Sequence, residues 1–295
     1  MKNTVFKGIA TAMVTPMNSQ GIDFDALARF IDFQIENGIN ALVPTGTTGE
    51  SATLSPEERK EVIRFTLKRV DGRVPVIAGT GTNDTRFVLE FTKFACDHGA
   101  DAVLVVTPYY NKATQHGLIA HYTAIADASE KPVIMYNVPS RTGCNLLPET
   151  VSVLADHPMI CGLKEASGNM AQVVDIIAQC GDRLDIYSGE DGLTQPMMAM
   201  GAMGCISVVS NVMPRETVEM AEKMLCGDFR GAAEMQLRLL PLIHSLFSEV
   251  NPIPAKAALS EMGYCENYVR LPLTPMTEKN KEIMFARMRE LGVLK

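Results

Sequence analysis

The sequence predicts an α/β fold, a (β/α)8 TIM barrel followed by a C-terminal helical extension. Segments with helical periodicity alternate with short apolar, β-branched runs over the first 210 residues. Eight such strand–helix units in ~210 residues are typical of this barrel. The predicted strands cover about residues 8–15, 41–46, 74–80, 102–108, 132–138, 159–166, 184–190 and 204–210.

The runs have the composition of buried parallel strands. Residues 102–106 are Ala-Val-Leu-Val-Val, a continuous apolar stretch that suits a strand covered on both faces. The helix predicted over residues 55–70 begins with a capping box of Ser55 and Glu58, and Pro56 occupies its first position. An open doubly wound sheet is the alternative from pattern alone, but the strand count favours the barrel.

The strand signal stops after residue 211, and only helical patterns follow. They cover about residues 213–226, 229–248, 254–262 and 277–291. We therefore predict a catalytic barrel over residues 1–225 and a C-terminal helical region over residues 226–295.

Composition excludes several classes of function. The net charge of -7 argues against binding of nucleic acid, and no apolar run approaches the ~18 residues that span a bilayer. The seven cysteines are scattered, which predicts reduced thiols and a cytoplasmic protein. The five histidines lack the spacing of metal ligands, so we expect no metal and no cofactor.

Lys164 is the most informative residue for chemistry. It ends an apolar run and is followed by a turn of small residues. Desolvation disfavours the charged ammonium form, so such an amine can act as a nucleophile and form a Schiff base with a carbonyl substrate. The alternative is a strand-end lysine whose amine reaches solvent.

Polar segments also follow other predicted strands, and barrel active sites lie after the carboxyl ends of strands. Tyr136 can exchange protons during Schiff-base chemistry, and Arg141 can bind a carboxylate through two hydrogen bonds. Strand alternation places Glu165 on the face opposite Lys164. A tight turn at 46–49 and a surface charge at Arg141 are the alternatives without function. The polar segments are 45–51, 107–111, 136–143, 188–190 and 207–211.

Four motifs carry a resemblance to a known family. They are Gly-Thr-Thr-Gly-Glu-Ser at 46–51, Thr-Pro-Tyr-Tyr-Asn at 107–111, Tyr-Asn-Val-Pro-Ser-Arg-Thr-Gly at 136–143 and Gly-Leu-Lys-Glu-Ala at 162–166. From about residue 4 to the C-terminal helices, the sequence resembles the pyruvate-dependent class I aldolases of the N-acetylneuraminate lyase type. The Ser-Arg-Thr-Gly segment resembles the members that use L-aspartate 4-semialdehyde, because the sugar-acid lyases usually lack it.

The resemblance implies the catalytic groups. Lys164 is expected to form the Schiff base with pyruvate, and Tyr136 to be the central proton donor and acceptor. Thr47 is expected to link Tyr136 to Tyr110, which the adjacent subunit contributes. A shared tyrosine implies at least a dimer, and the family is usually a homotetramer, a dimer of dimers.

The resemblance also implies how substrates bind. Thr48 and the backbone at Ile206 are expected to hold the pyruvate carboxylate, and Gly189 is a further substrate-binding candidate. Arg141 is expected to bind the carboxylate of L-aspartate 4-semialdehyde. The product is a cyclic precursor of diaminopimelate and lysine. The alternatives are a sugar-acid or N-acetylneuraminate lyase and, in another class, a non-catalytic keto-acid-binding homologue.

Members of the family that are inhibited by L-lysine have a regulatory pocket near the shared tyrosines. Three residues of this sequence match that pocket, namely Ser51, Asn83 and Tyr109. Three positions depart from it, namely Pro56, Arg59 and Phe87. Because Phe87 cannot accept a hydrogen bond from an ammonium group, we expect weak or absent inhibition by L-lysine.

Overall fold

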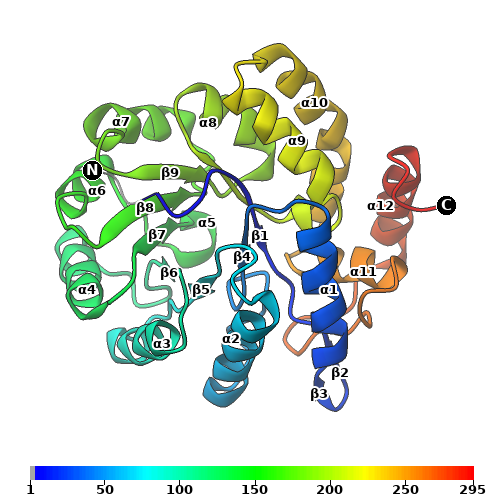
Figure 1. Cartoon of the computed structure of the whole chain (residues 1–295), viewed down its shortest axis with the longest axis horizontal. Helices are drawn as coiled ribbons and strands as arrows, with labels where there is room; N and C mark the ends of the chain where they lie inside the picture. The colour runs from blue at the N-terminus through cyan, green and yellow to red at the C-terminus, as the bar shows by residue number, and fades with distance from the viewer. Residues whose placement is uncertain (1–3) are drawn as a thin grey trace.

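Eight parallel strands form a closed barrel at the centre of the chain (Figure 1). The computed structural model describes residues 4–295. A parallel bridge between Leu42 and Val76 joins the two ends of the sheet, which confirms the predicted barrel. In spatial order the strands are β4 (Ala41–Val43), β1 (Gly8–Ala12), β10 (Gly204–Ser207), β9 (Asp185–Ser188), β8 (Ile160–Glu165), β7 (Val133–Asn137), β6 (Ala102–Val106) and β5 (Ile77–Gly79).

Helices surround the barrel on the outside (Figure 1). The predicted capping box is present at α2, where Ser55 Oγ accepts from Glu58 N at 3.1 Å and Glu58 Oε2 accepts from Ser55 N at 2.9 Å. The helices up to residue 225 are α1 (Phe24–Glu36), α2 (Pro56–Val70), α3 (Thr85–Asp97), α4 (Gln115–Ala128), α5 (Pro139–Thr142), α6 (Pro148–Leu154), α7 (Met170–Cys180), α8 (Thr194–Ala199) and α9 (Pro214–Leu225).

Strand alternation divides the buried side chains into two clusters. Along β7, Val133 and Met135 belong to the cluster between strands and helices, whereas Ile134 and Tyr136 belong to the cluster inside the barrel. Successive side chains of a strand point to opposite faces, so every second residue enters the barrel. This alternation decides which strand residues can reach a site at the barrel mouth.

A short antiparallel hairpin after β1 was not predicted. It pairs β2 (Met17–Asn18) with β3 (Gly21–Ile22). Each of its strands has only two residues, which is too short to produce a periodic pattern in the sequence.

Three further helices follow the barrel, near the predicted positions: α10 (Phe229–Leu246), α11 (Ile253–Glu261) and α12 (Glu278–Glu290). The amine of Lys256 on α11 lies 2.5 Å from Glu50 Oε1, and both side chains are fully buried. Arg270 pairs with Glu58 of α2 at 2.5 Å. The region therefore packs on the barrel of its own chain, while the division at residue 225 stays a prediction. Among residues 4–295, no helix is long and apolar enough to cross a membrane.

Candidate active site

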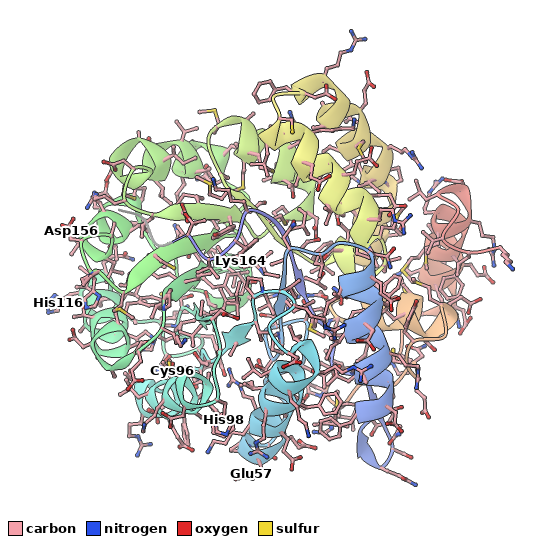
Figure 2. The ribbon with its side chains drawn as sticks, viewed as in Figure 1. Glu57, Cys96, His98, His116, Asp156 and Lys164 are labelled. Atoms are coloured by element: carbon pink, nitrogen blue, oxygen red, sulfur yellow. The ribbon has the colours of Figure 1, made fainter. Side chains whose placement is uncertain are left out.

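A cavity of about 510 Å³ opens at the carboxyl ends of the strands. Lys164 on β8 lines it and lies inside the ring of strands, whereas the labelled His116 and Asp156 lie at the periphery (Figure 2). Only 5% of Lys164 is exposed, so its amine is held within the barrel and does not extend to the outer surface. This placement rules out the alternative of a solvent-seeking strand-end lysine.

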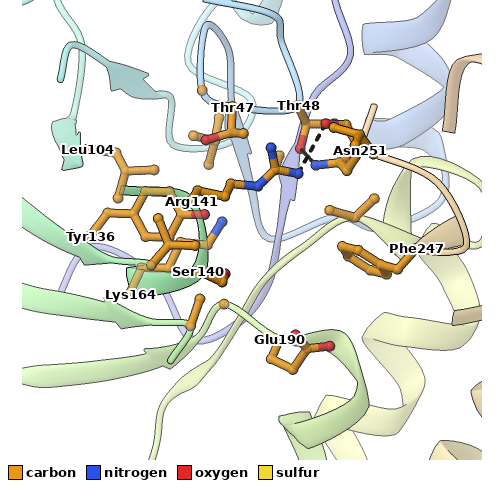
Figure 3. A pocket seen from close by; sticks show the side chains of 18 of the residues that line it. Thr47, Thr48, Leu104, Tyr136, Ser140, Arg141, Lys164, Glu190, Phe247 and Asn251 are labelled. Atoms are coloured by element: carbon orange, nitrogen blue, oxygen red, sulfur yellow. Dashed lines mark hydrogen bonds between the residues drawn. The ribbon is translucent and has the colours of Figure 1, made fainter. Parts of the chain in front are cut away.

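Lys164 lies against Tyr136 of the neighbouring strand (Figure 3). The two residues are paired in the register of β7 and β8, and Lys164 Nζ is 4.4 Å from the centre of the Tyr136 ring. Gly189 gives the lysine its space, because a Cβ at this position would lie 2.9 Å from Lys164 Cε and 2.6 Å from Ala166 Cβ. The aromatic ring and the missing side chain at residue 189 together define the position of the amine.

Glu165 points away from Lys164, as alternation predicted. Its carboxylate accepts from Asn137 Nδ2 at 2.9 Å and from Ser167 N at 2.7 Å. Burial raises the pKa of Glu165, and the hydrogen bonds partly oppose this effect. Across the described part of the chain, Lys164 forms no ion pair. Glu165 is therefore bonded to groups outside the cavity and is not an ion-pair partner of Lys164.

Two acidic residues after β9 were not singled out from the sequence. Asp191 is buried and accepts from Ser207 Oγ at 2.5 Å and from Val208 N at 2.8 Å, so it fixes the segment after β10. Glu190 lines the cavity. Burial raises the pKa of both carboxyl groups. Their signal in the sequence was only a polar strand end, which is common.

Thr48 and Arg141 meet at the mouth of the cavity through Asn251 (Figure 3). Asn251 Nδ2 donates to Thr48 Oγ1 at 2.9 Å, and Arg141 Nη2 donates to the backbone oxygen of Asn251 at 3.1 Å. Asn251 lies between α10 and α11, far from both partners along the chain. No local pattern pointed to it, so sequence reasoning missed it.

The structure brings six of the eight predicted catalytic and substrate-binding residues to one cavity, namely Thr47, Thr48, Tyr136, Arg141, Lys164 and Gly189. Two others lie elsewhere. Ile206 is fully buried in the barrel interior, and Val208 of the following segment lines the cavity. Tyr110 is 89% exposed and has a positive φ of 73°.

Only two of the three predicted regulatory residues line a common cavity. Ser51 and Tyr109 line a second cavity of about 270 Å³, which shares Arg141 and Asn251 with the first. Asn83 does not line this second cavity, and its backbone oxygen accepts from Asn111 Nδ2 at 3.0 Å. Two of the positions that depart from the family's regulatory pocket differ in exposure: Phe87 is 44% exposed, whereas Arg59 is buried.

Arg59 is occupied by structural contacts. Its Nη2 donates to Gly79 O at 2.7 Å and to Gly81 O at 3.1 Å, and its guanidinium carbon lies 4.4 Å from the centre of the Phe91 ring. Burial lowers the pKa of Arg59 to about 10. The guanidinium thus joins α2 to the segment after β5.

No group of three or more potential metal-ligating side chains occurs within residues 4–295.

The chain is similar to known proteins over nearly its whole length. Residues 5–290 match the model of the dihydrodipicolinate synthetase family. The 4-hydroxy-tetrahydrodipicolinate synthase of Geobacter metallireducens is 50% identical, over 98% of this chain and 100% of its own. The solved dihydrodipicolinate synthase of Thermotoga maritima has a TM-score of 0.97 at 43% identity, over 99% of this chain and 100% of that one.

A second solved structure is the Acinetobacter baumannii dihydrodipicolinate synthase, complexed with pyruvate. It has a TM-score of 0.96 at 42% identity and covers 99% of this chain and 100% of that one. These matches agree with the barrel described above. The chain belongs to the dihydrodipicolinate synthetase family.

Proposed function

We propose that the chain has 4-hydroxy-tetrahydrodipicolinate synthase activity, the condensation of pyruvate with L-aspartate 4-semialdehyde in lysine biosynthesis. The observation that carries this proposal is the buried amine of Lys164, 4.4 Å from the Tyr136 ring, in a cavity with Arg141 at its mouth. Membership in the family and the activity of the curated relatives support the choice of substrates.

The reaction begins at Lys164. Its neutral amine attacks the C2 carbonyl of pyruvate, and loss of one water from the carbinolamine gives the Schiff base. Tyr136 supplies and removes the protons that these steps require. The pyruvate carboxylate accepts a hydrogen bond from the hydroxyl of Thr48 and lies beside the backbone at Ile206, and Gly189 leaves room next to the amine. The iminium acts as the electron sink, so the chemistry needs neither metal nor cofactor.

The Schiff base then forms the carbon–carbon bond. Loss of a proton from the pyruvate methyl group gives an enamine, whose carbon attacks the aldehyde carbon of L-aspartate 4-semialdehyde. Arg141 binds the carboxylate of this second substrate. The substrate amine then displaces Lys164 by transimination, which closes the ring and restores the free lysine. One water is released for each pair of substrates.

We further propose that the active site is shared between subunits of a homotetramer, a dimer of dimers. Tyr110 is 89% exposed, and its positive φ of 73° is a strained conformation that L-residues rarely adopt. Such strain is typical of functional segments. In this arrangement Thr47 relays protons between Tyr136 and the tyrosine of the adjacent subunit.

Subunit sharing can be tested by complementation. Lys164→Ala and Tyr110→Phe each inactivate their own homo-oligomer. Random mixing of the two chains within dimers restores about a quarter of the sites, because half of the dimers are mixed and each has one intact site. A mixture without regained activity would show that Tyr110 serves its own chain.

A cytoplasmic location is part of the same proposal. Within residues 4–295 none of the seven cysteines forms a disulfide, and five of them are buried, as expected for a reducing compartment.

Borohydride trapping tests the chemistry. Incubation with pyruvate and borohydride should add the reduced adduct to Lys164, as located by peptide mass spectrometry, and Lys164→Ala should give none. Turnover is then compared for condensation of pyruvate with L-aspartate 4-semialdehyde, for cleavage of N-acetylneuraminate and for cleavage of 2-keto-3-deoxygluconate. An unmodified Lys164 would reject the Schiff-base mechanism, and turnover of a sugar acid alone would reject the proposed substrate.

A further inference from the structure

Asn251 connects the two groups that are proposed to bind substrate carboxylates. It is 5% exposed, and its side-chain amide donates to Thr48 Oγ1 while its backbone oxygen accepts from Arg141 Nη2 (Figure 3). We propose that Asn251 is a positioning residue that orients the hydroxyl proton of Thr48 and restrains the guanidinium of Arg141. This inference rests on the function proposed above and deepens it.

The direction of the hydrogen bond at Thr48 is the main point. A threonine hydroxyl has one proton to donate and two lone pairs that accept. Because the Asn251 amide occupies a lone pair of Thr48 Oγ1 at 2.9 Å, the proton remains available to an acceptor in the cavity. A carboxylate is such an acceptor, and hydrogen bonds to charged groups are the stronger ones. Asn251 thus makes Thr48 a donor toward pyruvate.

The segment that holds Asn251 is itself fixed in place. Ile253 N donates to Val250 O at 2.9 Å, which closes a turn around Asn251 immediately before α11. Farther along α11, Lys256 forms the buried ion pair with Glu50, which belongs to the same loop as Thr48. The donor and the hydroxyl are therefore attached to one rigid unit. A rigid support is what a positioning role requires.

The segment that contains Asn251 also holds the guanidinium of Arg141. Arg141 is exposed, and the carbonyl of Asn251 accepts from only one of its five N–H donors. The remaining donors stay available for a carboxylate. Because Thr48 and Arg141 both bond to Asn251, this residue sets the separation between the sites for pyruvate and for the aldehyde substrate.

Asn251→Asp tests the proposal, because Asp has nearly the same shape and its carboxylate cannot donate. The Thr48 proton would then turn toward Asp and away from pyruvate. We expect the KM for pyruvate to rise about tenfold, equivalent to ~1.4 kcal/mol, and the KM for L-aspartate 4-semialdehyde to rise as well. Asn40→Asp is the matched control, because the side-chain oxygen of Asn40, which Asp keeps, accepts from Ile9 N at 2.7 Å at the other end of the barrel.

A double-mutant cycle with Thr48→Val separates proton orientation from simple charge repulsion. Without the hydroxyl, Asn251→Asp should change the KM for pyruvate less than about twofold, because no proton remains to be turned. An equal effect in both backgrounds would overturn the inference. Asn251→Ala adds no charge and must show the same dependence on Thr48, which keeps the test decisive if the Asp variant folds poorly.

The wild-type adduct separates this inference from the proposed function. Absence of a pyruvate adduct at Lys164 in the wild-type enzyme would reject the proposed function and, with it, the role of Asn251. A normal wild-type adduct with an unchanged KM in Asn251→Asp would overturn the role of Asn251 alone.

Discussion

Gly189→Ala should slow the enzyme about a hundredfold through a single added methyl group. The new Cβ would lie 2.9 Å from Lys164 Cε, 3.0 Å from Lys164 Cγ and 2.6 Å from Ala166 Cβ. Carbon atoms prefer separations of about 3.5–4.0 Å, so the lysine must move by roughly 0.5–1 Å or change rotamer. A misplacement of ~1 Å at a reacting group can cost ~10²-fold in rate, and overpacking costs ~1–3 kcal/mol of stability.

The assay compares the rate of the borohydride-trapped pyruvate adduct and kcat/KM in Gly189→Ala with those of the wild type. Gly192→Ala is the control, because its Cβ would meet nothing closer than Leu240 Cδ1 at 3.7 Å. We expect adduct formation to slow by ~10²-fold in the first variant and to stay unchanged in the second. Rates within twofold of the wild type in Gly189→Ala would refute the reasoning that Gly189 positions Lys164.

Three further predictions concern stability and regulation. Lys256→Met leaves Glu50 as a buried charge without its partner, so urea unfolding should show a loss of ~3–5 kcal/mol, largely restored in the double variant with Glu50→Leu. Burial lowers the pKa of His121 from 6.5 to about 4. Between pH 6.5 and about 4 the unfolded state binds more protons than the folded state. The free energy of unfolding should therefore fall by on the order of 3 kcal/mol as the pH is lowered through this range. The fall should be smaller in His121→Gln, which has no imidazole at this position. L-Lysine should inhibit turnover weakly or not at all, because Phe87 offers no acceptor, and a low-micromolar inhibition constant would contradict this.

The barrel could be predicted from the sequence because its signals are local. Each buried parallel strand is a continuous apolar run, and each helix has apolar residues at helical spacing along one face. The strands proved shorter than the runs, as with β4, which covers Ala41–Val43 within the predicted 41–46. The residues after Val43 leave the sheet and form the loop at the barrel mouth, where Thr45 adopts a positive φ of 55°. The two-residue strands of the β2–β3 hairpin gave no signal.

The cavity residues on the strands could be predicted for the same reason. Side chains alternate along a strand, so a lysine at the end of β8 and a tyrosine on β7 must share the interior of the barrel. Asn251 could not be found in this way, because it lies 203 residues from Thr48 and 110 from Arg141 along the chain. No periodicity encodes a contact of that separation; it arises only when α10 and α11 pack on the barrel.

The residues that carry the chemistry lie on strands, whereas those that recognise the second substrate lie on a short helix and a loop. Tyr136 and Lys164 lie on β7 and β8, whose paired backbones fix the Cα positions of both residues. Arg141 lies on the short helix α5, and its guanidinium is held by a carbonyl from the segment between α10 and α11. Loops tolerate substitution more readily than strands do. A change at residue 251 can therefore alter which carboxylates are bound while Schiff-base formation persists.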